Sequence, residues 1–254
     1  MSAPAVITER PAEGVGLIRI NRPEARNALN MEVRRLIGQH LTEMADDDSV
    51  RCIVLTGNDK AFAAGADIKE MANAGTIEML QRGTQKLWRI IYGCPKPVIA
   101  AVSGFALGGG CELAVYSSRR VVAMESYIGL VEVGVGLVPG AGGLTYIARR
   151  AAENAAASTG KDLLPFLTEG FTAAAMAKVG TSAIESRKLG YLLTSDLIVP
   201  HKDELLFVAI NEARAMFAGG YRPPHKRQFA VAGRSGIATL KGSLVNMRDG
   251  GFIS

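Results

Sequence analysis

Short aliphatic segments alternate with amphipathic ones through the first half of the chain, and this alternation limits the possible folds. Residues 51–56, 97–102 and 120–124 have the length and composition of buried strands, and helical patterns separate them. Strand and helix therefore alternate three times, as in crossover connections on a largely parallel sheet. Residues 5–8 and 15–20 predict an opening hairpin. The sequence thus predicts an α/β fold.

Amphipathic helices are predicted between these strands. Asn30 can cap a helix over 31–45, in which apolar side chains recur at helical spacing. A second helix is predicted over 77–91. One face of this helix is a mostly apolar stripe that consists of Leu80, Thr84, Leu87, Trp88 and Ile91. A shorter helical stretch follows Gly108–Gly110.

The pattern changes after Gly143. Residues 148–180 are rich in alanine and predict helices broken at Gly160, Pro165 and Gly170. Residues 178–199 predict a helix and a final short strand. From His201 the chain is expected to be rich in loops, with one helix over 204–217. We divide the chain into a core, 1–190, and a C-terminal helical and loop region, 191–254.

Composition excludes several classes of protein. With 254 residues, 48% of them hydrophobic, the chain is long enough for a full core and is not a disordered tail. No segment has the roughly 18 to 20 uninterrupted apolar residues of a membrane helix. Residues 1–14 carry Glu9, Arg10 and Glu13 in place of a signal peptide's apolar centre. We expect a soluble, cytoplasmic protein without membrane contact.

The cysteines and the net charge limit the possible disulfides, metal sites and partners less strictly. Cys52, Cys94 and Cys111 form no C-x-x-C pair and lie among apolar residues, so we expect buried thiols. The net charge of +5 suits an anionic partner. Since the basic residues are dispersed instead of lining one helix face, a phosphate-bearing small molecule is favoured and nucleic acid is not expected.

Familiar nucleotide and metal motifs are missing. Residues 158–161 (STGK) look like the end of a phosphate-binding P-loop, but Ala155 and Asp162 stand where that motif needs glycine and Ser or Thr. The three histidines, His40, His201 and His225, are scattered, and no H-E-x-x-H occurs. We therefore expect no metal site.

Two glutamates are the first candidate catalytic residues. Glu132 interrupts an almost wholly apolar run, where a lone carboxylate costs several kcal/mol unless it is paired or protonated. Glu112 follows three glycines at the start of a predicted helix. Its other explanation is structural, because acidic residues stabilise helix N-termini. A buried carboxylate with a raised pKa can act as an acid or base near neutral pH.

Two loops of small residues are the second candidate feature. Gly109 and Gly110 offer backbone N–H groups at a helix start, where a developing oxyanion is stabilised. Residues 61–68 form a similar loop after a predicted strand. Together the two loops can offer two amides to one carbonyl oxygen. The alternative is a tight strand-to-helix turn without a function.

At these positions the sequence resembles the crotonase (enoyl-CoA hydratase/isomerase) superfamily. Four motifs in the expected order carry the resemblance: 21–30 (NRPEARNALN), 61–71 (AFAAGADIKEM), 96–113 (KPVIAAVSGFALGGGCEL) and 139–143 (PGAGG). The resemblance implies a crotonase-like spiral of repeated ββα crossover units, with a C-terminal helical region and an acyl-CoA bound across it.

The resemblance also implies a chemistry. The thioester oxygen would lie between the amides of Ala66 and Gly109, and the two hydratase glutamates correspond to Glu112 and Glu132. Both glutamates together favour addition of water to a 2-trans-enoyl-CoA, as in fatty acid β-oxidation. The only cofactor-like group implied is the substrate's coenzyme A. The residues expected along the CoA channel are Arg26, Ala28, Ala64, Ala66, Asp67, Ile68 and Lys69.

The two ends of the chain resemble different branches of the superfamily. The N-terminal part is similar to stand-alone hydratases, whereas the sequence after about Tyr116 is similar to the crotonase portion of bacterial 3-hydroxyacyl-CoA dehydrogenases. We hypothesise a recombined chain with a junction within 104–115, which a single natural gene encoding the whole chain would refute. The second branch is expected to continue past Ser254.

Other outcomes stay open. The family implies a homotrimer or a dimer of trimers. A 3,2-enoyl-CoA isomerase and a folded but inactive chimera are the main alternatives to the hydratase. RNA binding, known in a crotonase-like protein, would need a basic helix face.

Overall fold

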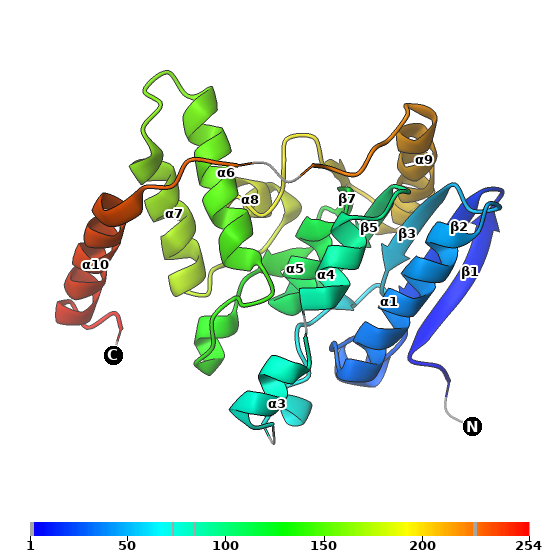
Figure 1. Cartoon of the computed structure of the whole chain (residues 1–254), viewed down its shortest axis with the longest axis horizontal. Helices are drawn as coiled ribbons and strands as arrows, with labels where there is room; N and C mark the ends of the chain where they lie inside the picture. The colour runs from blue at the N-terminus through cyan, green and yellow to red at the C-terminus, as the bar shows by residue number, and fades with distance from the viewer. Residues whose placement is uncertain (1–2, 73, 84, 226–227, 254) are drawn as a thin grey trace.

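The computed structural model describes residues 3–72, 74–83, 85–225 and 228–253 (Figure 1). Its larger sheet has six strands in the order β1-β2-β3-β5-β7-β10. The first pair is antiparallel and every other pair is parallel, as predicted. The strands are β1 (Val6–Ala12), β2 (Val15–Ile20), β3 (Cys52–Thr56), β5 (Val98–Val102), β7 (Arg119–Ala123) and β10 (Leu197–Val199).

A smaller sheet runs beside it in the order β4-β6-β8-β9. Each of its first three strands directly follows a strand of the larger sheet, and a helix or a 3-10 turn comes next. This repeated unit confirms the predicted ββα spiral. The strands are β4 (Ala61–Ala63), β6 (Phe105–Leu107), β8 (Tyr127–Gly129) and β9 (Val179–Gly180).

Helices cover both faces of the larger sheet (Figure 1). On β2 the side chains of Ile18 and Ile20 join the core under α1 and α4, whereas those of Val15 and Leu17 pack toward α9. This alternation explains why the strands are apolar on both faces. The helices are α1 (Met31–Asp46), α2 (Ile68–Met71), α3 (Thr76–Gln81), α4 (Gln85–Tyr92), α5 (Gly109–Tyr116), α6 (Gly143–Ala157), α7 (Leu163–Ala175), α8 (Ala183–Lys188), α9 (Leu205–Ala218) and α10 (Gly233–Asp249). Short 3-10 turns occur at η1 (Pro23–Ala25), η2 (Glu132–Val135) and η3 (Lys202–Glu204).

Several local predictions are confirmed. Asn30 Oδ1 accepts a hydrogen bond from the Val33 amide at 2.9 Å and caps α1. All three cysteines are buried thiols. In the described part of the chain, no helix combines the length and hydropathy that a membrane span requires.

The single helix predicted over 77–91 is wrong. The structure divides it into α3 and α4, and Gly83 between them has a φ of +55°, which interrupts the helical path. Leu87, Trp88 and Ile91 are buried on α4 as the stripe predicted. Thr84 and the side chain of Leu80 lie outside the described residues.

The helix breaks predicted at Pro165 and Gly170 are also wrong. Pro165 occupies the first turn of α7, where a missing N–H removes no intrahelical hydrogen bond. Gly170 lies inside α7, where its lack of a side chain permits close packing on α6, since a Cβ there would come within 2.4 Å of Ile147 Cγ2. The expected break at Gly160 is confirmed, and α6 begins at Gly143 instead of residue 148.

The helix predicted within 178–199 is much shorter, because only α8 forms there, between β9 and β10. The last segment contains α10 as well as the expected α9. α10 was missed because glycines interrupt its sequence and only Gly236 among its residues is buried. Figure 1 shows α10 beside α7, at the opposite end of the molecule from β1.

Candidate active site

Three consecutive glycines fix the start of α5. Gly108 has a φ of +50°, a backbone conformation that a side chain would strain. A Cβ at Gly110 would lie 2.0 Å from the carbonyl oxygen of Ala63, so only glycine lets the first turn of α5 approach β4 this closely. The run of glycines therefore positions the N-terminus of α5 against the loop that follows β4.

Two backbone amides meet at this contact. A Cβ atom added to Gly109 would lie 3.8 Å from the backbone nitrogen of Ala66. Gly109 is the first residue of α5, so its N–H has no partner within the helix. Among the described residues, no carbonyl accepts a hydrogen bond from either N–H. The pair has the arrangement of donors that binds a carbonyl oxygen and stabilises negative charge on it.

Glu112 lies in the same first turn of α5 and is 2% exposed. Its Oε1 accepts a hydrogen bond from the Gly143 amide at 2.8 Å. Burial raises the pKa of Glu112 to about 7, and repulsion from Glu132 adds to this effect, while the hydrogen bond from Gly143 opposes it. The carboxyl group can therefore gain or lose a proton near neutral pH.

Glu132 begins η2 on the other side of Gly108. Its Oε1 would lie 3.2 Å from a Cβ atom added to Gly108, so the carboxylate is close to the start of α5. Its Oε2 is buried and has no hydrogen-bond partner among the described residues. Desolvation raises the pKa of this carboxyl group. From Glu132 onward the apolar run itself is not buried, because Glu132 is half-buried and residues 133–138 are exposed. The unpartnered Oε2 is available to a bound molecule.

One cavity of about 320 Å³ brings these groups together. Ala66, Gly109, Glu112 and Glu132 all line it, and Trp88 contributes an apolar wall. A carbonyl group held at the two amides would have two carboxyl groups of raised pKa nearby, and such groups can act as acid and base beside a carbonyl group. The four sequence-predicted catalytic and oxyanion residues are therefore neighbours in space.

The predicted CoA-channel residues are only partly brought together. Ala64, Ala66 and Ile68 line the same cavity as the glutamates. Arg26 lines a different hollow, and its guanidinium carbon lies 5.9 Å from the centre of the Phe105 ring. Ala28 does not line either space.

Two further predicted CoA residues have other local roles. Asp67 is paired with Arg22 at 3.1 Å, and it caps α2 by accepting a hydrogen bond from the Glu70 amide. Lys69 is exposed on α2 and does not line the cavity. Neither residue therefore meets the glutamates in this cavity.

Sequence reasoning missed two arginines that line this cavity, Arg34 on α1 and Arg82 after α3. The guanidinium carbon of Arg34 lies 5.7 Å from the centre of the Trp88 ring. Within an amphipathic helix an arginine looks like a solvated residue, so no local pattern distinguishes Arg34. The buried Trp88 was assigned to the core stripe and not to the site.

Comparison with known proteins identifies the family. Residues 10–180 match the enoyl-CoA hydratase/isomerase family. The chain is 45% identical to a crotonyl-CoA hydratase of Syntrophomonas wolfei over 140 residues, which cover 54% of this chain and 54% of that protein. It is 32% identical to a probable 3-hydroxyacyl-CoA dehydrogenase of Bacillus subtilis over 240 residues, covering 90% of this chain and 29% of that protein. The chain thus spans about half the length of the first of these relatives.

A solved structure supports the same assignment. An enoyl-CoA hydratase from Bacillus anthracis superimposes with a TM-score of 0.69 and 27% sequence identity, over 85% of this chain and 78% of that one. The sheet order, the ββα repeats and the family match agree with the crotonase fold expected from the four motifs. The chain belongs to the enoyl-CoA hydratase/isomerase family.

Proposed function

We propose that this protein is an enoyl-CoA hydratase, a lyase that adds water to a 2-trans-enoyl-CoA in fatty acid β-oxidation and forms a 3-hydroxyacyl-CoA. The observation that carries the proposal is the single cavity that Glu112, Glu132 and the amides of Ala66 and Gly109 all line. The family match and the hydratase names of its relatives support the same reaction.

In the proposed reaction the thioester oxygen accepts hydrogen bonds from Ala66 and Gly109. The oxygen of water forms a bond to C3 as the C2=C3 π bond breaks, one glutamate takes the proton that this water loses, and the other delivers a proton to C2. The negative charge passes through the thioester oxygen as an enolate, where the two amides stabilise it. Glu112 and Glu132 share the acid and base roles, and we do not divide the roles between them.

The substrate's coenzyme A would extend from this cavity along the predicted channel. Ala64, Ala66 and Ile68 are the channel residues that line the cavity. We propose that Arg26, Ala28, Asp67 and Lys69 belong to the outer part of the same channel. The reaction needs no metal and no cofactor other than the CoA of the substrate.

Hydration is tested by the loss of the conjugated-thioester absorbance of crotonyl-CoA, with Glu132→Gln measured beside the wild type. Turnover that disappears in the variant supports hydration in this cavity. A folded protein that binds CoA without turning over crotonyl-CoA would favour an inactive chimera. Isomerisation of a 3-enoyl-CoA without hydration would favour the 3,2-enoyl-CoA isomerase.

We also propose that the chain joins two subfamilies near residues 104–115, with a spiral core over 1–190. Higher identity over a short alignment with a hydratase, and lower identity over most of the chain with a dehydrogenase, support this proposal. A natural gene that encodes the whole chain would contradict it.

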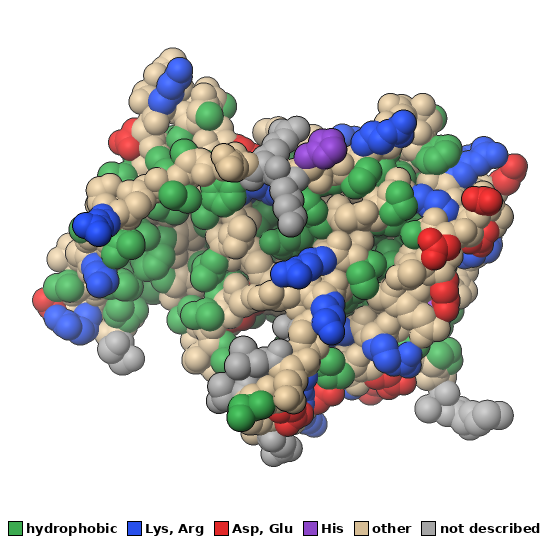
Figure 2. Space-filling model, viewed as in Figure 1, with side chains coloured by type: hydrophobic (Ala, Val, Ile, Leu, Met, Phe, Trp, Pro, Cys, Tyr) green, Lys and Arg blue, Asp and Glu red, His purple; other side chains and the backbone are tan. Residues whose placement is uncertain are grey.

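We propose a homotrimer or a dimer of trimers located in the cytoplasm. Apolar side chains on the surface support association, and Figure 2 shows several of them at the end of the molecule where α7 and α10 lie. On and near α10, Val231 is 73% exposed, Ile237 56% and Phe252 74%. Light scattering that gives the mass of a monomer would contradict the assembly.

A further inference from the structure

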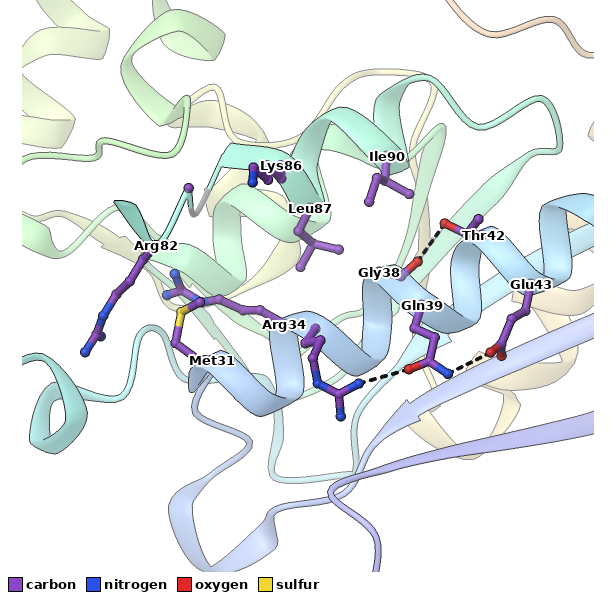
Figure 3. A pocket seen from close by; sticks show the side chains of 12 residues that line it. Met31, Arg34, Gly38, Gln39, Thr42, Glu43, Arg82, Lys86, Leu87 and Ile90 are labelled. Carbon is purple, nitrogen blue, oxygen red and sulfur yellow. Dashed lines mark hydrogen bonds between the residues drawn. The ribbon is translucent and has the colours of Figure 1, made fainter. Parts of the chain in front are cut away.

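A second hollow of about 560 Å³ lies between α1 and α4 (Figure 3). Leu87 and Ile90 of α4 pack directly against Gly38 of α1, and charged side chains, among them Glu43 and Lys86, also line the hollow. We call this hollow the α1–α4 groove. Met31, Arg34 and Arg82 line both the groove and the cavity that holds the glutamates. The two spaces are therefore adjacent, and these three residues separate them.

The two arginines at this boundary differ in their partners. Arg82 is paired with Glu78 at 2.7 Å and lies 3.9 Å from Glu70. Arg34 donates from Nε to the carbonyl oxygen of Leu29 at 3.1 Å and packs over Trp88. Within the described residues, no carboxylate forms an ion pair with Arg34, and its two Nη atoms have no hydrogen-bond acceptor. Figure 3 shows Arg34 and Arg82 at the same end of the groove.

The guanidinium of Arg34 is partly buried, so it has lost part of its hydration. Arg34 is half-buried, and desolvation lowers the pKa of its guanidinium, although an arginine remains protonated at neutral pH. Glu70 and Glu112 attract its charge and its Nε has an acceptor, but its two Nη donors have no acceptor among the described residues. The Nη donors of a guanidinium match a carboxylate in a bidentate arrangement. Within the described ranges, Arg34 thus has two unpaired Nη donors and lines the cavity wall.

We propose that Arg34 binds a carboxylate at the far end of the substrate's acyl chain, so that the enzyme prefers 2-enoyl-CoA thioesters of dicarboxylic acids. The inference rests on the proposed function, because it assumes that the thioester lies at Ala66 and Gly109. Trp88 and Leu29 line the same cavity and offer apolar surface to the methylene groups between the thioester and the carboxylate. A chain that ends in a methyl group would leave the guanidinium without an acceptor.

The phosphates of coenzyme A are the other anions on the substrate. They are separated from the thioester by the whole pantetheine arm, whereas Arg34 lines the same cavity as Ala66, Gly109 and both glutamates. A carboxylate on the short acyl side therefore fits the position of Arg34 better than a phosphate does.

Calorimetric binding of saturated thioesters tests the inference without requiring turnover. The probes are hexanoyl-CoA and its analogue with a terminal carboxylate, 5-carboxypentanoyl-CoA, together with the corresponding pairs of eight and ten carbons. We expect the carboxylated member of at least one pair to bind at least about tenfold more tightly, as a hydrogen-bonded charge pair should. Arg34→Met should reduce this ratio to about one, and Arg34→Lys should leave an intermediate ratio.

Arg89→Met is the matched control, because Arg89 is exposed on α4 and lines neither the cavity nor the groove. It should keep the wild-type ratio. Thermal unfolding of each variant shows whether the fold is retained, and Arg34→Lys keeps the test informative if Arg34→Met fails to fold.

Three outcomes overturn the inference. The first is equal affinity of the wild type for both members of all three pairs. The second is a carboxylate preference that survives in Arg34→Met. The third is an Arg34→Met variant that weakens both members equally, which would assign Arg34 to the CoA portion. A retained carboxylate preference without hydration of crotonyl-CoA would instead contradict the proposed reaction and leave the role of Arg34 standing.

Discussion

The carboxylate of Glu112 is held by the amide of Gly143, 31 residues further along the chain, through a hydrogen bond of 2.8 Å. This contact joins the first turn of α5 to the first residue of α6. It fixes one carboxylate oxygen, and the same side chain lines the catalytic cavity. The orientation of Glu112 therefore depends on both α5 and α6, and Glu132 lies between these two helices in the sequence.

Replacing Glu112 with glutamine should abolish most of the proposed hydration. The side-chain amide oxygen of the variant can still accept the hydrogen bond from Gly143, so the fold should be retained, but the group can no longer exchange a proton. We expect kcat for crotonyl-CoA to fall by about 10² to 10⁴. The exposed Glu169→Gln is the control and should keep wild-type activity. Isomerisation of a 3-enoyl-CoA that survives in Glu112→Gln would favour the isomerase instead.

The raised pKa of Glu112 predicts a specific dependence of stability on pH. The pKa rises from an ordinary value of 4.5 to about 7 in the folded state, so between these values the folded protein keeps a proton that the unfolded chain has lost. The free energy of unfolding should therefore fall as pH rises from about 4.5 to 7, by about 3 kcal/mol from this group.

Urea unfolding of the wild type and Glu112→Gln at pH 5 and pH 7.5 measures this effect. Glutamine stays neutral, so the wild type should lose stability relative to the variant at the higher pH. A stability difference between the two proteins that does not change with pH would show that Glu112 titrates at its ordinary pKa.

Much of the fold could be predicted because the segments with apolar sequence patterns are the ones that the structure buries. The strands 51–56 and 97–102 are apolar on both faces, and the structure places both inside the larger sheet. The interruption at Gly83 could not be predicted, because an apolar stripe on both sides of it continues the helical period. Gly170 was misjudged because its role is a close contact with Ile147, which depends on how α6 and α7 pack.

In the candidate site, too, residues with an unusual local sequence could be predicted, whereas residues placed by tertiary packing could not. Glu132 was visible as one charge in an apolar run, and the glycines before Glu112 suggested a helix start with available amides. Arg34 could not be found in this way, since its position over Trp88 depends on the packing of α1 against α4. Residues identified by an unusual sequence context were therefore found, and those identified only by tertiary contacts were not.

Two adjacent glycines should respond differently to alanine. A methyl group at Gly109 would meet Leu29 and the Ala66 nitrogen at 3.7 and 3.8 Å, which are ordinary contacts. Gly109→Ala should therefore fold, but the methyl group would fill the space beside the two amides. We expect crotonyl-CoA hydration to fall on the order of 10²-fold with little change in Tm.

Gly110→Ala is the structural counterpart. Its methyl group would lie 2.0 Å from the Ala63 carbonyl oxygen, so α5 must move away from β4. We expect a loss of about 3 kcal/mol in the free energy of unfolding. Wild-type activity in a folded Gly109→Ala protein would remove the two amides from the proposed mechanism.

Loss of a buried ion pair outside the site should destabilise the fold strongly. Arg120 on β7 and Asp196 before β10 have side chains that are 3% and 0% exposed, and their closest charged atoms are 2.8 Å apart. Asp196→Ala leaves a buried guanidinium without its partner and should cost about 3 to 5 kcal/mol of unfolding free energy in urea titrations. Asp249→Ala is the matched control, because it removes an exposed pair with Arg248 at 3.0 Å and should cost less than about 1 kcal/mol. Equal losses in the two variants would mean that burial does not set the strength of the Arg120 pair.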